Sequence, residues 1–293
     1  MFHIKRVLWA LRKARIPVSN KGLVLDVGSG GTPYSRSDVL LDRLTGAEHR
    51  CGAPMMLDRP AVFGDAAKMP FKDKAFDFVI ASHILEHMSD PVEFLKELAR
   101  VGKAGYIETP NAVFERLCPY DIHCLEIAVV NNVLHIHKKK KPVEDDFLGK
   151  LGMLKDDQKW KSFMHEMPDM FHVRYFWSNT INYKIYNAET DCSWIEGIND
   201  ESEHGDVKQN YMDDRPGWRG IGLKVLAAYH TYLRRGRLKK FDIKSILACP
   251  ECKGYLEENK GLLYCVYCNY SYTSMPNPDF TCAVHADGDS VAD

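Results

Sequence analysis

A buried strand that runs straight into a glycine-rich turn constrains this chain more than any other feature of its sequence. Residues 23–25 and Val27 make a short, continuous apolar run, which is typical of a central parallel strand covered on both faces. Gly28 and Gly30 follow at once, and residues without a Cβ atom let a ligand approach the backbone. The string predicts a binding site at the carboxyl end of this strand, although an ordinary tight turn explains it equally well when it is taken alone.

The residues around the two glycines narrow the class of ligand. A dinucleotide-binding turn, G-x-G-x-x-G, needs a third glycine so that a helix can pack closely behind it, and Pro33 stands at that position. Asp26 lies two residues before Gly28, where a carboxylate can accept a hydrogen bond from a ligand ammonium group. S-adenosylmethionine has such a group and NAD has none, so the turn favours the former.

Composition sets the size and the compartment of the protein. A chain of 293 residues, 45% of them hydrophobic and 27% charged, has room for one large domain and a small one. A net charge of -1 gives no global attraction to nucleic acid or to an anionic membrane. No apolar run reaches the roughly 18 residues of a membrane span, and residues 1–17 lack the apolar centre of a signal peptide. We therefore expect a cytoplasmic protein without a transmembrane segment.

Alternating elements follow the glycine turn. Strands are expected over residues 39–42, 61–65, 75–81 and 104–109. A helix should begin after Asp90 as N-cap, with Pro91 at its first position and Glu93 completing a capping box. The short stretch between Gly30 and Val39 leaves hardly any room for a crossover helix. The alternation predicts an α/β, Rossmann-like fold, with a mostly parallel sheet, helices on both faces and ligands at the carboxyl ends of the strands.

Acids close successive strands of this expected sheet. Asp42 ends the second strand and Asp65 the third, while the fourth leads into the segment Ser82-His83-Ile-Leu-Glu86-His87. Either acid, taken alone, is equally well explained as a solvated residue at a strand end. In order and spacing, residues 20–115 resemble the class I S-adenosylmethionine-dependent methyltransferases, specifically the type-11 group that includes ubiquinone-pathway methyltransferases.

The resemblance implies a cofactor, S-adenosyl-L-methionine, and a place for each of its parts. Its methionine moiety would be surrounded by Asp26, Gly28 and Gly30. Asp42 would hold the ribose hydroxyls, Asp65 and Ala66 the adenine, and Ser82 with His83 would line the cofactor near its sulfonium. Thr32 stands where many members carry a further glycine, and the first crossover helix is nearly missing. Both departures leave the partner of the methionine carboxylate open.

Candidate catalytic residues follow the fourth strand. Methyl transfer from a sulfonium is an in-line displacement, so the protein mainly has to align donor and acceptor and exclude water. A base is needed only when the acceptor arrives protonated, and His83, Glu86 and His87 are the candidates. A structural role, in which Glu86 and His87 hydrogen-bond neighbouring loops, is the alternative. The segment lacks the Asn/Asp-Pro-Pro-aromatic signature of many amino methyltransferases, which favours an oxygen acceptor.

Four of the nine cysteines form two C-x-x-C pairs twelve residues apart: Cys249, Cys252, Cys265 and Cys268. Each pair can present two thiolates to one tetrahedral Zn²⁺, and four thiolates leave no open position, so a structural zinc ribbon in a reducing compartment is predicted. Residues 239–281 resemble the small zinc-binding activator subunit of certain tRNA and release-factor methyltransferases. On the same chain, such a module is expected to dock on its own catalytic domain.

Composition and periodicity divide the chain into six segments. They are an N-terminal amphipathic helix (1–19), a methyltransferase domain with a hairpin over 125–137 and substrate-cover additions after residue 115 (20–188), an acidic flexible loop (189–215), a helix that becomes a basic linker (216–240), the ribbon (241–281) and a disordered tail (282–293). The first helix packs against the sheet or lies on a membrane surface. The tail holds Cys282 and His285, which can extend a metal site but read more simply as a stray pair.

The acceptor is the least determined partner. A small molecule or a glycan is favoured, because the middle of the chain reads as a cover for its own substrate. The zinc module suggests tRNA or another translation component instead, and two basic runs, residues 135–141 and 234–240, can bind RNA phosphates if they share a face. A solvated hairpin end and a charged linker are the simpler interpretations of these runs. A third alternative is a non-catalytic cofactor- or zinc-binding protein, which the missing first helix permits.

Overall fold

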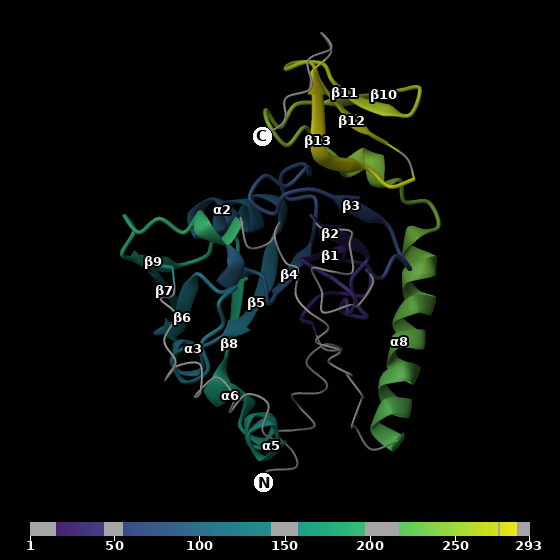
Figure 1. Cartoon of the computed structure of the whole chain (residues 1–293). Coiled ribbons are helices and arrows are strands. Elements are labelled where there is room, and N and C mark those ends of the chain that lie inside the picture. Colours follow the sequence, from purple (N-terminus) through teal and green to yellow (C-terminus); the bar gives the residue numbers. More distant parts are fainter. Residues whose placement is uncertain (1–15, 44–54, 142–157, 197–216, 275, 286–293) are drawn as a thin grey trace.

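A single ten-stranded sheet runs through the whole protein in the computed structural model, which describes residues 16–43, 55–141, 158–196, 217–274 and 276–285. Its central strands are β1 (Val24–Val27), β2 (Val39–Asp42), β3 (Ala61–Phe63), β4 (Phe78–Ser82), β5 (Ala104–Pro110) and β8 (His172–Ser178). The order β3-β2-β1-β4-β5 is parallel throughout, and β8 is added antiparallel to β5 (Figure 1). This order reverses direction between β1 and β4, where open α/β sheets bind ligands, and it confirms the predicted Rossmann-like fold.

Helix α2 (Pro91–Val101) covers one face of this sheet. Its N-cap, Asp90, accepts hydrogen bonds from the backbone N–H groups of Val92 and Glu93, with Pro91 at the first position, so the predicted helix start is confirmed. Apolar side chains on one side of the helix are fully buried against the sheet, among them Phe94 and Leu98. Glu93 pairs with Lys96 through a 2.6 Å contact.

The connection from β1 to β2 is a loop, as the sequence predicts, and a smaller apolar cluster covers the second face of the sheet beside it. This cluster comprises Val24, Tyr34, Phe78, Ile80 and Tyr106. The fourth strand begins at Phe78, three residues later than the expected start, because Phe76 forms only an isolated bridge with Gly102.

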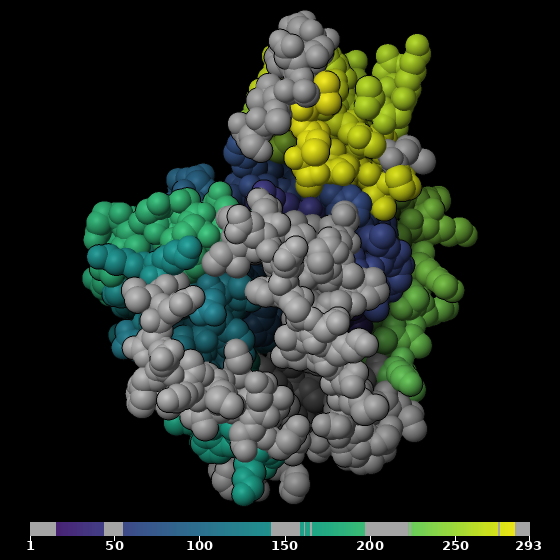
Figure 2. All heavy atoms as spheres, viewed as in Figure 1, coloured from purple at the N-terminus to yellow at the C-terminus, as the bar shows by residue number. Residues whose placement is uncertain are grey.

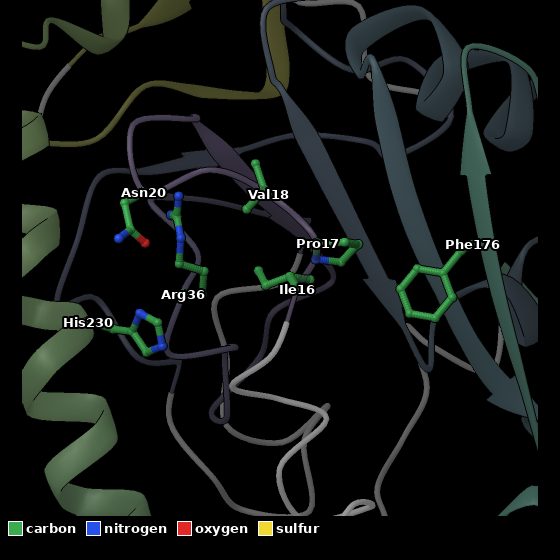
Figure 3. A pocket seen from close by; sticks show the side chains of 7 residues that line it. All are labelled: Ile16, Pro17, Val18, Asn20, Arg36, Phe176 and His230. Atoms are coloured by element: carbon green, nitrogen blue, oxygen red, sulfur yellow. The ribbon is translucent and has the colours of Figure 1, made fainter.

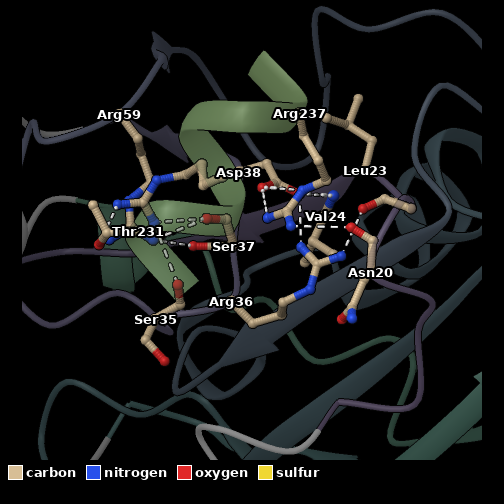
Figure 4. Close-up of polar contacts among 12 residues, drawn as sticks. Asn20, Leu23, Val24, Ser35, Arg36, Ser37, Asp38, Arg59, Thr231 and Arg237 are labelled. Carbon is tan, nitrogen blue, oxygen red and sulfur yellow. Dashed lines mark hydrogen bonds and ion pairs between the residues drawn. The ribbon is translucent and has the colours of Figure 1, made fainter. Parts of the chain in front are cut away.

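Helix α8 (Gly217–Leu238) lies alongside the β1–β2 region in Figure 1. The predicted basic linker is wrong over residues 234–238, because these residues form the last turns of the helix. Arg234 is 3% exposed and bonds to Asp58. Arg237 pairs with Asp38, which is itself 0% exposed, as Figure 4 shows. Arg237 therefore neutralises a buried carboxylate of the sheet domain and Arg234 pairs with an exposed one, so these two arginines are not part of a solvated run.

A three-stranded sheet packs beside the main one. The hairpin of β6 (Leu125–Val130) and β7 (Val133–Lys138) confirms the predicted hairpin, with Asn131 and Asn132 at φ 50° and 59° in its turn. The third strand is β9 (Tyr183–Tyr186), which pairs parallel with β7. Helices α3 (Ala112–Leu117), α5 (Gln158–Glu166) and α6 (Pro168–Phe171) complete this half.

The cysteine-rich end of the chain continues the main sheet. Strands β10 (Leu256–Asn259), β11 (Leu262–Cys265), β12 (Tyr270–Thr273) and β13 (Asp279–His285) pair antiparallel in sequence order, and β13 then pairs parallel with β3. This part is a lobe at the top of the molecule in Figure 2. The predicted tail is wrong over residues 282–285, because they belong to β13; residues 286–293 lie outside the described residues.

Other expected segments are described only in part. Residues 1–15 of the expected first helix lie outside the described residues, and residues 16–19 are irregular. The expected acidic loop lies outside them from residue 197, and residues 194–196 form a short helical turn. Along the described parts of the chain, we find no helix of the length and apolar character that a membrane crossing requires.

Candidate active site

The glycine turn and the end of β2 meet at the carboxyl edge of the sheet. Gly28 and Gly30 have φ values of +66° and +52°, a conformation that residues with a side chain rarely adopt. The Gly30 N–H donates to Asp42 Oδ2 at 3.0 Å, and the Gly28 N–H donates to the carbonyl of Leu41 at 2.8 Å. A Cβ atom on Gly28 would lie 2.8 Å from Ile84 Cδ1. The structure thus brings three of the predicted cofactor residues into one turn and leaves no room for a side chain there.

Asp26 is placed differently from the other predicted cofactor residues. It is 2% exposed within β1, and its Oδ2 accepts a hydrogen bond from the Tyr34 N–H at 2.7 Å. This bond ties the loop that replaces the first crossover helix to the central strand. Next to it, the Ser29 hydroxyl is buried, and among the described residues it has no hydrogen-bond partner. Buried polar groups are normally satisfied, so this hydroxyl is compatible with a polar ligand at the turn.

Asp65 and Ala66 follow β3, and Asp65 accepts hydrogen bonds from within its own loop. Asp65 Oδ1 accepts from the Ala67 N–H at 2.7 Å, which is a tight turn closed by the side chain. The cysteine-rich lobe holds this loop from the other side, because the Phe63 N–H donates to the carbonyl of Pro278 at 2.9 Å. The sequence did not indicate that the expected adenine side of the site would lie against the cysteine-rich lobe.

His83 turns the chain sharply at the end of β4. Its φ of 57° is unusual for a residue with a side chain, and its backbone N–H donates to the carbonyl of Glu108 at 2.8 Å. The ring lies between two carboxylates, with Nδ1 3.3 Å from Glu86 and Nε2 3.5 Å from Glu108. Burial disfavours the charged ring, but the hydrogen bonds and charges of Glu108 and Glu86 outweigh it and raise the pKa of His83 to about 9.

Glu86 is buried beneath this edge. Its second oxygen accepts from the Thr109 hydroxyl at 2.8 Å, and Ser82, another predicted site residue, contacts Glu108 at 3.5 Å. Burial raises the pKa of the Glu86 carboxyl, but His83 and the other nearby imidazoles outweigh that effect and lower it to about 2. The predicted residues Ser82, His83 and Glu86 therefore share one polar cluster with Glu108 and Thr109 of β5.

His87 and His123 extend the cluster away from the sheet. His87 Nδ1 donates to the carbonyl of Ile122 at 2.7 Å, and burial lowers the pKa of His87. His123 is 6% exposed, packs edge-on against His87 with ring centroids 4.7 Å apart, and contacts Glu115 through Nδ1. His123 and Glu115 are not among the residues predicted from the sequence, because they lie in a stretch without any motif.

The four cysteines of the C-terminal lobe converge on one point. Their sulfur atoms lie within 4.8 Å of one another, with Cys249 3.5 Å from Cys268 and Cys252 3.4 Å from Cys265. The residue after each pair, Lys253 and Asn269, has φ near +60°, so the two turns are built alike. A tetrahedral zinc with Zn–S bonds of about 2.3 Å places its sulfurs about 3.8 Å apart, and the four cysteines fit such an ion.

One hollow of the described residues lies elsewhere. A cavity of about 550 Å³ is lined by Ile16, Pro17, Val18, Asn20, Arg36, Phe176 and His230 (Figure 3). None of the residues predicted for the cofactor or for catalysis belongs to this lining. The candidate active site is therefore assigned to the carboxyl edge of the strands, where the functional side chains meet, and not to this cavity.

The matches to known proteins include the central strands of the sheet. Residues 25–107 match a family model described as "Methyltransferase domain". The chain is 45% identical over 42 residues to ajmaline N-methyltransferase of Rauvolfia serpentina and 40% identical over 58 residues to demethylmenaquinone methyltransferase of Roseiflexus sp.. These matches cover 14% and 19% of this chain, and they span 14% and 24% of the relatives' own length.

Two solved structures are also similar. A SAM-dependent methyltransferase from Archaeoglobus fulgidus is 27% identical, with a TM-score of 0.28, and the match covers 36% of this chain and 53% of that one. A chain from the complex of the Haloferax volcanii Trm112 methyltransferase activator with a methyltransferase is 17% identical, with a TM-score of 0.35, covering 61% and 90%. By the family match, the chain contains a methyltransferase domain that runs from β1 into β5.

Proposed function

We propose that the protein transfers a methyl group from S-adenosylmethionine to an oxygen atom of a small molecule or a glycan. One observation carries the proposal: the glycine turn is hydrogen-bonded to Asp42 at the carboxyl edge of the sheet. Both belong to the residues that match a methyltransferase domain. When bound, S-adenosylmethionine supplies an electrophilic methyl group on a positively charged sulfur. The residues of this chain then have to bind it, exclude water and align the acceptor.

The proposed cofactor residues divide into two groups. Gly28, Gly30 and Asp42 form the turn itself, where backbone and carboxylate can contact the methionine and ribose parts. Asp65 and Ala66 come after β3, on the expected adenine side, and Ser82 is the last residue of β4, on the expected sulfonium side. Asp26 supports the site from below through its bond to Tyr34.

On the acceptor side we propose His83, Glu86 and His87. A hydroxyl acceptor loses its proton as the new C–O bond forms and the C–S bond breaks, so a group near the reacting oxygen has to receive that proton. His83 has 44% of its side chain exposed at the edge, whereas Glu86 is 1% exposed. His83 is thus the side chain of this group that can touch an acceptor, and Glu86 positions its ring. Because the pKa of His83 is raised to about 9, the ring is protonated at neutral pH and can receive a proton only as the pH rises through that value.

Two measurements test the proposal. Calorimetry with S-adenosylmethionine and S-adenosylhomocysteine should show binding, and lack of binding would support the non-catalytic alternative. Incubation of the protein and methyl-labelled cofactor with a cell extract, fractionated into RNA, protein, glycan and small molecules, should place the label in one of the last two fractions. Label in the RNA or protein fraction would refute the acceptor class and leave the methyltransferase activity standing.

Replacing single histidines tests the acceptor side. His83→Asn or His87→Asn should lower turnover by about 10²–10⁴-fold for whichever residue takes the proton, while cofactor affinity stays unchanged. If neither variant loses more than a few-fold across the pH range, catalysis here relies on alignment without a protein base.

We also propose that Cys249, Cys252, Cys265 and Cys268 hold one structural Zn²⁺ that supports the catalytic domain. Four thiolates saturate a tetrahedral ion, so no water can be activated there. The lobe shares its apolar core with the sheet domain, and Lys253 of the first cysteine turn pairs with Glu97 of α2 at 3.0 Å. Reduced thiolates also agree with the expected cytoplasmic location.

The second candidate function is methylation of tRNA or another translation component, which the cysteine-rich module favours. Positive charge for binding RNA phosphates is reduced in the second basic run, because Arg234 and Arg237 are paired with Asp58 and Asp38. The run at residues 135–141 is partly in β7 and partly exposed. RNA binding that weakens steeply with salt would favour this second candidate over a small acceptor.

A further inference from the structure

A second group of metal-binding side chains lies beside the proposed acceptor site. One ligand atom from each of Glu86, His87 and His123 lies within 4.8 Å of the other two. Glu86 is 1% and His123 6% exposed, and His87 is partly buried. We propose that these three residues bind a divalent transition-metal ion, with Zn²⁺ as the first expectation, in addition to the four-cysteine site.

The hydrogen bonds of the two imidazoles orient them as metal ligands. Nδ1 of His87 donates to the carbonyl of Ile122, and Nδ1 of His123 is held by the Glu115 carboxylate. With Nδ1 engaged, Nε2 of each ring is the nitrogen left to act as a ligand. Histidines that bind metals nearly always donate their other N–H to a backbone carbonyl or a carboxylate, and both arrangements occur here side by side.

The backbone fixes the three ligands relative to one another. Glu86 and His87 form a short helical turn, η2 (Leu85–His87), and Thr109 of β5 holds the Glu86 carboxylate. The Cys124 N–H donates to the Glu86 carbonyl at 2.9 Å, which ties the segment containing His123 to that turn. Supports of this kind are what a metal site needs to hold its geometry.

The ligand types agree with a transition-metal ion. Glu86 and Glu115, 1% and 2% exposed, place two carboxylates around the imidazoles. Glu86 also pairs with His83, and Glu115 with Lys139 at 3.1 Å, so neither carboxylate depends on the ion for its charge compensation. Two imidazoles and one carboxylate suit zinc or another first-row transition metal better than Mg²⁺ or Ca²⁺, which prefer oxygen ligands.

The geometry requires a small closure. A zinc ion with bonds of about 2 Å to nitrogen and oxygen holds its tetrahedral ligand atoms about 3.3 Å apart. The ligand atoms of Glu86, His87 and His123 lie within 4.8 Å of one another, so small side-chain movements bring them to that spacing. Glu86 Oε1 also lies 3.3 Å from His83, but a carboxylate has about four lone-pair sites and can accept from His83 and bind an ion together.

Three protein ligands leave at least one position of a tetrahedral ion open. An anionic oxygen of the acceptor is the ligand that such a position takes, and this last step rests on the proposed function. His87 would then act as a ligand and not as a base, because a metal-bound nitrogen cannot receive the proton. His83, on the same edge, would remain the side chain that contacts the acceptor.

Metal content of the full chain tests the site. After equilibrium dialysis against buffered Zn²⁺, the wild-type protein should hold about two zinc ions per chain, and His123→Asn and His87→Asn about one each. His137→Asn, a matched substitution on β7 at a histidine that contacts Asn187, should keep about two. Cofactor binding is measured by calorimetry on the same samples, so failure of the metal site and failure of the proposed function are separate results.

The absorption of bound Co²⁺ distinguishes the two sites. It is measured on the wild-type protein, so the test does not depend on whether the histidine variants fold. Co²⁺ added to wild-type protein that has been prepared with one zinc per chain, held by the cysteines, should give d–d absorption without thiolate charge-transfer bands, because the new ligands are nitrogen and oxygen. One zinc per wild-type chain with no such absorption would overturn the proposal, as would two ions retained in both histidine variants. In either case the three side chains form a hydrogen-bonded cluster and no metal site.

Discussion

Removing the carboxylate of Asp42 is the sharpest test of the cofactor site. The Asp42 side chain accepts the Gly30 N–H at 3.0 Å, and it is the proposed partner of the ribose hydroxyls. Asp42→Asn keeps an oxygen that can accept from Gly30, but it removes the negative charge. Asp42→Ala removes both, so the two variants separate support of the turn from contact with the cofactor.

The expected losses follow from the number of hydrogen bonds affected. Weakening charged hydrogen bonds to the ribose should cost Asp42→Asn about 1–2 kcal/mol of binding free energy. At 1.4 kcal/mol per factor of ten, this is a loss of roughly 5- to 30-fold in affinity. Asp42→Ala also leaves the Gly30 N–H without this acceptor, which brings the loss to about 2–4 kcal/mol, or roughly 30- to 700-fold.

The assay is calorimetric titration of S-adenosylmethionine into each variant, with thermal melting as a check on folding. Asp191→Asn is the matched control, since it makes the same charge change at an acid whose contacts are with Ser193, and it should bind as the wild type does. Wild-type affinity in Asp42→Ala would remove Asp42 from the site. Equal losses in the two Asp42 variants would mean that the charge alone matters and that the bond to Gly30 does not.

Three other substitutions test the frame around the site. Asp90→Ala should lower the free energy of unfolding by about 1 kcal/mol in urea, because two backbone N–H groups lose their N-cap acceptor; an unchanged midpoint would contradict the cap. Gly28→Ala should weaken cofactor binding at least tenfold by calorimetry, since φ is +66° and the new Cβ atom would lie 2.8 Å from Ile84. Binding as tight as in the wild type would show that the backbone of the turn can move to accept a side chain. Cys252→Ser should release about one zinc per chain and lower the melting temperature, while cofactor affinity changes little. Strand β13 pairs with β3 just before Asp65. Loss of cofactor binding by a sheet domain that is still folded would therefore mean that the cysteine-rich lobe shapes the cofactor site.

The sequence by itself determined the elements whose signals are local. The apolar run before Gly28, the cap at Asp90 and the hairpin over 125–137 each depend on residues within a short stretch of chain, and all three structures appear where they were expected. The same holds for the cysteine pairs, since two residues between thiols suffice to aim both at one point. Asp42 could also be predicted to lie near the glycine turn, because parallel strands end at one edge.

Only the tertiary structure decided what depends on partners distant in the chain. A run of arginines reads the same in sequence whether it is solvated or paired, and the partner of Arg237 is Asp38, 199 residues away. His123 has no motif of its own, and it becomes a neighbour of Glu86 and His87 because the backbone bond from Cys124 brings its segment to the edge of β4. Nor does any local signal specify that β13 joins β3, since an edge strand presents the same unpaired N–H and C=O groups to whichever strand reaches it.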